Sequence, residues 1–175
     1  TKPAMTTATS ATNNTKLPIL GMAEAESTVT VYDGRTAIGT TKALSTGAWT
    51  FTPTTALAVG DHIITANATD AAGNVSEAST SIILTVDKTP PSTPVINKGS
   101  VTTDSGKPTI KGTAEVGSTV TVYDGATALG TCVTLSDGTW TVTSDKALSQ
   151  ASHTISAKAT DLAGNVSAAT TALTW

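Results

Sequence analysis

Hydrophobic and polar residues alternate along most of this chain with a period of two. The clearest runs in the first half of the chain are residues 28–31, 49–52 and 64–69, in which Val, Trp, Phe, Ile or Ala alternates with Thr or Asn. This period places the apolar side chains on one face of an extended strand and the polar ones on the other. The pattern therefore predicts half-buried β-strands.

Turn-forming residues interrupt these runs at regular intervals. These turn signals are Asp33-Gly34, Thr46-Gly47 and Ala72-Gly73-Asn74. Short strands separated by such turns, about seven of them in about 90 residues, are typical of two antiparallel sheets packed face to face. We predict an all-β, immunoglobulin-like sandwich.

The sequence repeats itself at an offset of 91 residues. Residues 19–84 align with residues 110–175 without a gap, so we predict two tandem sandwiches rather than one large domain. We place the first domain at residues 1–86 and the second at residues 87–175. The second begins with a linker, residues 87–94, whose three prolines favour an extended conformation.

The composition excludes several structural and functional classes. Thr is abundant, aromatic residues make up 3% and charged residues 13% of the chain, which favours strands and excludes a helical bundle. The net charge is −3 and neither half is basic, so we expect no nucleic-acid partner. Apolar runs fall far short of the roughly 20 residues that cross a bilayer, so we expect no membrane insertion in this segment. Cys132 is the only cysteine, and no disulfide within the chain is possible.

The aspartates at repeated positions are the candidate metal ligands. Asp33 and Asp124 end equivalent strands, and Asp70 and Asp161 end another equivalent pair. In a sandwich of this type we expect the second and the penultimate strands to run the same way, so that both finish where the chain enters the domain and where the linker residue Asp87 joins them. Asp87, Asp124 and Asp161 would then repel one another unless a cation lay between them. Ca²⁺, which takes about 6–8 oxygen ligands, suits such a set.

Two readings of these aspartates stay open at this stage. Asp-Gly and Asp-Xaa-Ala-Gly-Asn also form ordinary turns, in which the Asp side chain binds its own loop and Gly takes a positive φ. Asn74 and Asn165 are better explained as turn residues than as ligands. In the first domain Asp33 and Asp70 lack the preceding linker aspartate, so we expect that site to be weak or empty.

Other side chains with chemical potential are better explained by structure. Trp49 and Trp140 alternate with Thr, which predicts core packing rather than a platform for sugar binding. His62 and His153 open equivalent strands, but no Ser or Cys recurs with them as a nucleophile. We therefore predict that the chain is not an enzyme.

Four motifs at fixed spacing identify a family resemblance: Val-Thr-Val-Tyr-Asp-Gly, Gly-Xaa-Trp-Thr, Ala-Thr-Asp-Xaa-Ala-Gly-Asn-Val-Ser and the linker Asp-Lys-Thr-Pro-Pro. Together they resemble the bacterial immunoglobulin-like repeats of giant surface adhesins that are exported by type I secretion and take part in biofilm formation. The resemblance implies long rods at the cell surface, made rigid by Ca²⁺ at the junctions between domains. It also implies that Asp87 is the linker ligand, Asp124 or Asp33 the strand-end ligand, and Asp161 or Asp70 the loop ligand.

Three functions compete for this sequence. The leading hypothesis is a monomeric stalk of spacer domains whose partners are the neighbouring repeats of the same chain, with adhesion to an unidentified host-cell or biofilm ligand located elsewhere in the parent protein. The second is a module that binds a glycan or a protein through the loops that differ between the copies, residues 59–61 and 150–152. The third is an accessory domain of a secreted polysaccharide hydrolase.

Overall fold

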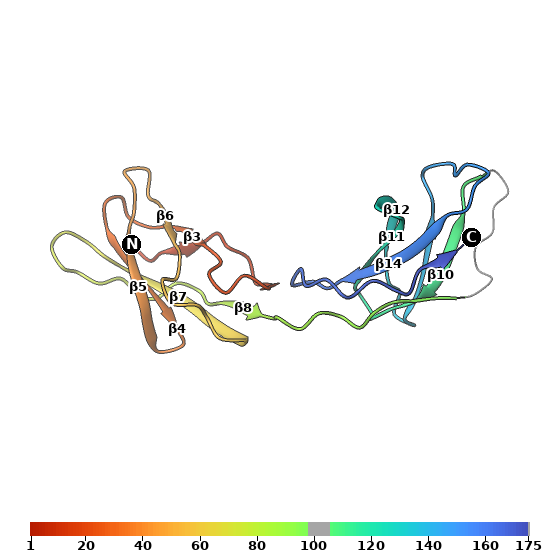
Figure 1. The fold of residues 1–175 in the computed structure, drawn as a ribbon. Coiled ribbons are helices and arrows are strands. Elements are labelled where there is room, and N and C mark those ends of the chain that lie inside the picture. The colour runs from red at the N-terminus through yellow and green to blue at the C-terminus, as the bar shows by residue number, and fades with distance from the viewer. Residues whose placement is uncertain (98–105, 175) are drawn as a thin grey trace. The chain divides into compact units, whose positions relative to one another are not determined.

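The computed structural model describes residues 1–97 and 106–174, and in this part of the chain every regular element is a β-strand (Figure 1). The chain divides into two compact units, Thr1–Lys88 and Thr89–Trp175. Within the described residues, no helix has the length and apolar character needed to span a membrane. The predicted all-β fold with two immunoglobulin-like sandwiches is confirmed.

The first unit contains eight strands in two sheets. One sheet has the order β1-β3-β6 and the other the order β2-β8-β7-β4-β5. Every pairing is antiparallel except that of β2 with β8. The strands are β1 (Ala4–Met5), β2 (Ser10–Thr12), β3 (Ile19–Met22), β4 (Thr28–Asp33), β5 (Thr36–Lys42), β6 (Ala48–Phe51), β7 (Gly60–Thr69) and β8 (Ile82–Val86).

The second unit repeats this arrangement over its described residues. Its sheets have the orders β13-β10-β9 and β12-β11-β14-β15. The strands are β9 (Val95–Ile96), β10 (Thr109–Thr113), β11 (Thr119–Asp124), β12 (Thr127–Val133), β13 (Thr139–Thr143), β14 (Thr154–Thr160) and β15 (Leu173–Thr174). The same register shift occurs in β4 after Val31 and in β11 after Val122, so the duplication preserves fine detail of the pairing.

Each unit has its own hydrophobic core between its two sheets. The alternating apolar residues supply it, as the period of two predicts. Trp49 and Trp140 are 2% and 1% exposed, which confirms that both belong to the core and not to a sugar-binding surface. Other core residues are Ile19, Val29, Val31, Ile64 and Leu84 in the first unit and Ile110, Val120, Val122, Leu129 and Ile155 in the second.

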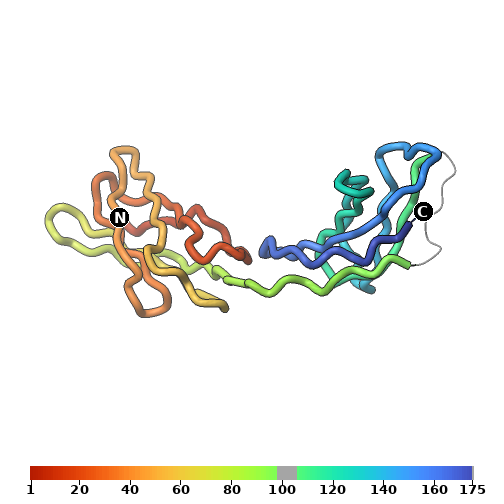
Figure 2. Tube along the Cα trace, in the orientation of Figure 1, coloured from red at the N-terminus to blue at the C-terminus, as the bar shows by residue number. Residues whose placement is uncertain are grey.

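Each sandwich has two ends, which are named here by the course of the chain through the unit. This course can be followed in Figure 2. We call the entry end the one at which β1 or β9 pairs with the last residues of β3 or β10, as in the pairs Ala4–Met22 and Val95–Thr113. The opposite end is the exit end. In the first unit β8 finishes there, where Val86 pairs with Gly60.

Candidate functional site

Antiparallel pairing separates the two repeated aspartates of each unit. In the first unit Thr28 pairs with Thr69 at the entry end, and Asp33 pairs with Ile64 at the exit end. Asp70, which follows Thr69, therefore lies at the entry end, a whole strand length away from Asp33. The expectation that the two strands run the same way is wrong, because they are direct neighbours in one antiparallel sheet.

The second unit gives the same correction for Asp124 and Asp161. Asp124 pairs with Ile155 near the start of β14, and Asp161 follows Thr160 at the end of β14. Asp124 therefore does not converge with Asp161, and neither Asp33 nor Asp124 belongs to a carboxylate set at the entry end.

Asp87 belongs to the first unit. Its backbone N–H donates a hydrogen bond of 3.0 Å to the carbonyl of Thr12, directly after β8. Within that unit it follows Val86 at the exit end, the end that also carries Asp33. The linker that begins at Asp87 leads into β9 of the second unit.

The strand-end aspartates are paired with histidines. Asp33 Oδ2 lies 2.6 Å from His62 Nδ1, and Asp124 Oδ2 lies 2.7 Å from His153 Nδ1. The backbone N–H of Thr154 donates to the second oxygen of Asp124 at 3.0 Å. The sequence analysis considered only Ser and Cys as partners of these histidines, so it did not predict this pair. The available signal was that Asp and His recur together, 29 residues apart in both copies.

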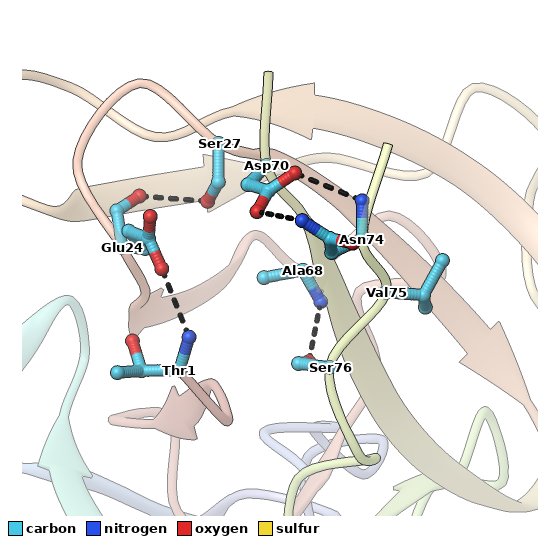
Figure 3. A pocket seen from close by; sticks show the side chains of 8 residues that line it. All are labelled: Thr1, Glu24, Ser27, Ala68, Asp70, Asn74, Val75 and Ser76. Carbon is cyan, nitrogen blue, oxygen red and sulfur yellow. Dashed lines mark hydrogen bonds and ion pairs between the residues drawn. The ribbon is translucent and has the colours of Figure 1, made fainter. Parts of the chain in front are cut away.

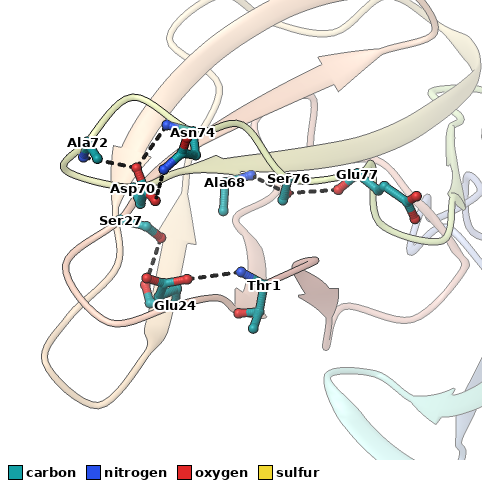
Figure 4. A network of polar contacts seen from close by, with 9 residues as sticks. All are labelled: Thr1, Glu24, Ser27, Ala68, Asp70, Ala72, Asn74, Ser76 and Glu77. Atoms are coloured by element: carbon teal, nitrogen blue, oxygen red, sulfur yellow. Dashed lines mark hydrogen bonds and ion pairs between the residues drawn. The ribbon is translucent and has the colours of Figure 1, made fainter.

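Asp70 organises the loop after β7 (Figure 4). Its Oδ1 accepts hydrogen bonds from the backbone N–H groups of Ala72 and Asn74 at 2.9 and 2.8 Å, and its Oδ2 accepts one from Asn74 Nδ2 at 2.8 Å. The bonds from Asn74 are the main reason that the pKa of Asp70 lies below its ordinary value. These hydrogen bonds confirm that Asp70 forms a turn with its own loop.

Asp161 makes the matching bonds in the second unit. Its Oδ1 accepts from the backbone N–H of Asn165 at 2.8 Å, and its Oδ2 accepts from Asn165 Nδ2 at 2.9 Å. Each carboxylate oxygen has more than one lone pair, so these bonds fix the orientation of the carboxylate without using all of its acceptor capacity.

A glutamate shares the entry end with each of these aspartates. In the first unit Glu24, Ser27, Asp70 and Asn74 line a pocket of about 110 Å³, shown in Figure 3. Ser27 fixes the glutamate loop, because its hydroxyl donates to the Glu24 carbonyl at 2.7 Å.

The second unit has the same glutamate loop. The hydroxyl of Ser118 donates to the Glu115 carbonyl at 2.7 Å, and Ser118 directly precedes Thr119, which pairs with Thr160. This register brings the Glu115 loop and the Asp161 loop to the same end of the unit. Sequence reasoning missed both glutamates because it considered only aspartates, although Glu24 and Glu115 recur at the same offset.

The entry end offers oxygen ligands suitable for a hard cation, but an incomplete set of them. Carboxylate, hydroxyl and amide oxygens are the ligand types that Ca²⁺ prefers, and it takes about 6–8 of them. Among the residues that the structure describes, no group of three or more His, Cys, Asp or Glu side chains is arranged to hold a metal ion. The pair of one Glu and one Asp described for each unit has donor chemistry that fits Ca²⁺, and further oxygens must come from outside this pair.

Comparison with known proteins places the chain in a family. The family model described as bacterial Ig-like domain matches residues 4–88 and again residues 95–174. No curated protein matches the sequence.

Among solved structures, the chain is similar to the fibronectin(III)-like modules of Clostridium thermocellum CbhA, with a TM-score of 0.62 and 17% identity over 98% of this chain and 92% of that one. That similarity concerns the fold. A biofilm-associated protein BSP domain has a TM-score of 0.40 and 21% identity over 99% of this chain and 29% of that one. This TM-score is too low for the similarity to support a structural or functional argument.

Proposed function

Since the chain belongs to the family of bacterial Ig-like domains, in two tandem copies, we propose that it is a spacer segment in the stalk of a large bacterial surface adhesin. In this role each domain extends the chain outside the cell, and adhesion to a host or biofilm surface belongs to another part of the parent protein. The proposal describes a non-catalytic segment.

Duplication of the whole domain is the observation that carries this proposal. Both copies keep the strand order, the register shift, the buried Trp and the turn after β7 or β14. Each copy also buries its own core. Domains that fold on separate cores and are joined by a proline-bearing linker can be added in series, which is what a spacer requires.

We extend the proposal to Ca²⁺ at the entry end of the second domain, and we expect the first domain, which lacks the preceding linker aspartate, to bind the ion weakly or not at all. In the second domain Glu115 and Asp161 would hold the ion, and Asp87 is the linker ligand that the sequence predicts. In the first domain Glu24 and Asp70 form the corresponding pair. When bound, the ion would neutralise these carboxylates and tie the residues that supply its oxygens to one point.

The expected affinity follows from the setting. Extracellular Ca²⁺ modules bind with dissociation constants of about 10⁻⁴–10⁻³ M. Such a site fills outside the cell and stays empty at the low Ca²⁺ concentration inside it. The loops at the entry end would therefore gain their final stability only after export.

A binding screen separates a spacer from a binding module. The two-domain chain is immobilised and exposed to arrays of glycans and of extracellular matrix proteins in millimolar Ca²⁺. A spacer gives no saturable binding. Saturable binding that disappears when residues 59–61 and 150–152 are both replaced by Gly-Ser-Gly would instead identify a glycan- or protein-binding module.

A further inference from the structure

Each unit holds one histidine between two hydrogen-bond acceptors. His62 Nδ1 lies 2.6 Å from Asp33 Oδ2, and His62 Nε2 lies 2.9 Å from the carbonyl oxygen of Ala58. In the second unit His153 Nδ1 lies 2.7 Å from Asp124 Oδ2, and its Nε2 lies 3.1 Å from the carbonyl oxygen of Ser149. Both imidazole rings are largely buried, with side chains 11% exposed.

This geometry determines which protonation state of the ring is satisfied. A carboxylate and a backbone carbonyl can only accept hydrogen bonds, and a neutral imidazole carries a single N–H. The neutral ring of His62 would leave one nitrogen lone pair facing an oxygen lone pair, whereas in the second unit the hydroxyl of Ser149, 3.5 Å from His153 Nε2, can donate to a neutral ring. Only the imidazolium form donates to both partners.

We propose that each domain contains a proton-operated latch, in which the imidazolium of His62 or His153 fastens the loop before β7 or β14 to the strand-end aspartate of β4 or β11. Deprotonation removes one of the two bonds and releases that fastening. The latch is a property of the folded domain and rests neither on the spacer role nor on Ca²⁺, because it lies at the end of the sheet opposite to the entry end.

The fastened loop covers part of the core. Leu57, which directly precedes Ala58, is 8% exposed, and its N–H donates to the carbonyl of Thr15 at 2.9 Å. Leu57, Ile38, Asp33 and His62 line an open pocket of about 370 Å³. Because the bond from Leu57 to Thr15 remains when the bond between His62 and Ala58 is lost, loss of the imidazolium loosens the loop without unfolding the domain.

The direction of the histidine pKa values agrees with the proposed latch. Burial lowers the pKa of His62, but the bonds to the Ala58 carbonyl and to Asp33, with a smaller effect of the Asp61 charge, outweigh it and leave the pKa above 6.5. For His153 the bond to Asp124 is the largest cause of a raised pKa, followed by the bond to the Ser149 carbonyl. The charged groups that raise the pKa values of the two rings include Asp33 and Asp61 in one unit and Asp124 in the other.

The sign of the stability effect follows from this direction. A group whose pKa is higher in the folded than in the unfolded state contributes its full stabilisation below the unfolded pKa, here about 6.5, and loses it as pH rises through the folded pKa. The latch therefore holds in mildly acidic solution and opens toward alkaline pH.

The direct test is a titration of the imidazole nitrogens of the full chain by NMR between pH 5 and 9, with a chelator present. We expect both histidines to titrate above 6.5, with Nδ1 and Nε2 both protonated on the acidic side. Asp33→Asn should lower the midpoint of His62 and leave His153 as an internal reference, and Asp124→Asn should do the reverse. Asp61→Asn is the matched control and should shift His62 by less than Asp33→Asn.

Two results would overturn the latch. One is a midpoint at or below 6.5 for both histidines of the unmodified chain, a measurement that needs no variant to fold. The other is a His62 midpoint that Asp33→Asn leaves unchanged. As a second readout, the melting temperature of the unmodified chain should fall between pH 6 and 9 more steeply than that of His62→Gln/His153→Gln, and equal slopes would also contradict the proposal.

Discussion

Gly112 and Trp140 pack against each other more closely than any residue with a Cβ atom would allow. A Cβ built on Gly112 would lie 2.5 Å from Cζ2 of the indole ring, and it would also collide with the carbonyl oxygen of Val95. Gly21 and Trp49 repeat the relationship in the first unit, where the carbonyl of Ala4 closes the same space. A glycine on β3 and on β10 is therefore a condition for burying the Trp.

Gly112→Ala should destabilise the second domain because neither the backbone of β9 nor the buried ring can move aside cheaply. Overpacking of this kind costs about 1–3 kcal/mol. Urea unfolding followed by Trp fluorescence would measure the loss.

Gly125→Asn is the control for this substitution. Gly125 has open space around its Cα and a φ of 55°, which Asn tolerates better than most residues. A loss of stability in Gly125→Asn as large as that in Gly112→Ala would show that close packing is not the reason for the glycine on β10.

Residues 89–175 expressed alone should fold cooperatively, because the second core contains only residues of that unit. Calorimetry should show one transition for this fragment and heteronuclear NMR a dispersed spectrum. A fragment that stays unfolded with and without Ca²⁺ would contradict the account of two autonomous domains.

Asp70→Ala should change how the first domain responds to acid. The pKa of Asp70 is held below its usual 3.8, chiefly by the hydrogen bonds from Asn74, so the stabilisation is present above that pH and is lost as pH falls through the lower folded pKa. Melting curves between pH 5 and 2 should be less pH-dependent in Asp70→Ala than in the unmodified chain. Glu77→Ala, an exposed acidic residue of the same domain, should keep the steeper dependence.

Local patterns and the repeat determine much of the fold. The alternation around Trp49 and Trp140 requires strands with one buried face, and the gapless repeat requires two copies of one core. Pairing between distant strands is not encoded in these patterns. Because β4 and β7 are antiparallel, Asp33 and Asp70 lie at opposite ends of the sheet. The alternation of apolar residues is the same for parallel and antiparallel strands, so it does not predict this separation.

The candidate site, too, could be predicted only where local sequence patterns reveal its residues. Asp70 and Asp161 were found because a repeated acidic residue beside a turn can be recognised from sequence. Glu24 lines the same pocket as Asp70 because its loop lies beside the end of β7. His62 pairs with Asp33 because β7 and β4 are neighbouring strands of one sheet. Both relationships come from tertiary structure, although the recurrence of these residues at one offset was visible beforehand.

Calorimetry of the full chain with and without millimolar Ca²⁺ tests the central claim, that Ca²⁺ binds at the entry end. A ligand that binds only the folded state adds about 2.7 kcal/mol at a hundredfold excess over its dissociation constant, so the transition of the second domain should move to higher temperature. Glu115→Gln and Asp161→Asn should each remove most of that shift. Asp124→Asn at the exit end and the exposed Asp145→Asn should keep it. Equal shifts in all five proteins, or no shift in the unmodified chain, would contradict the claim.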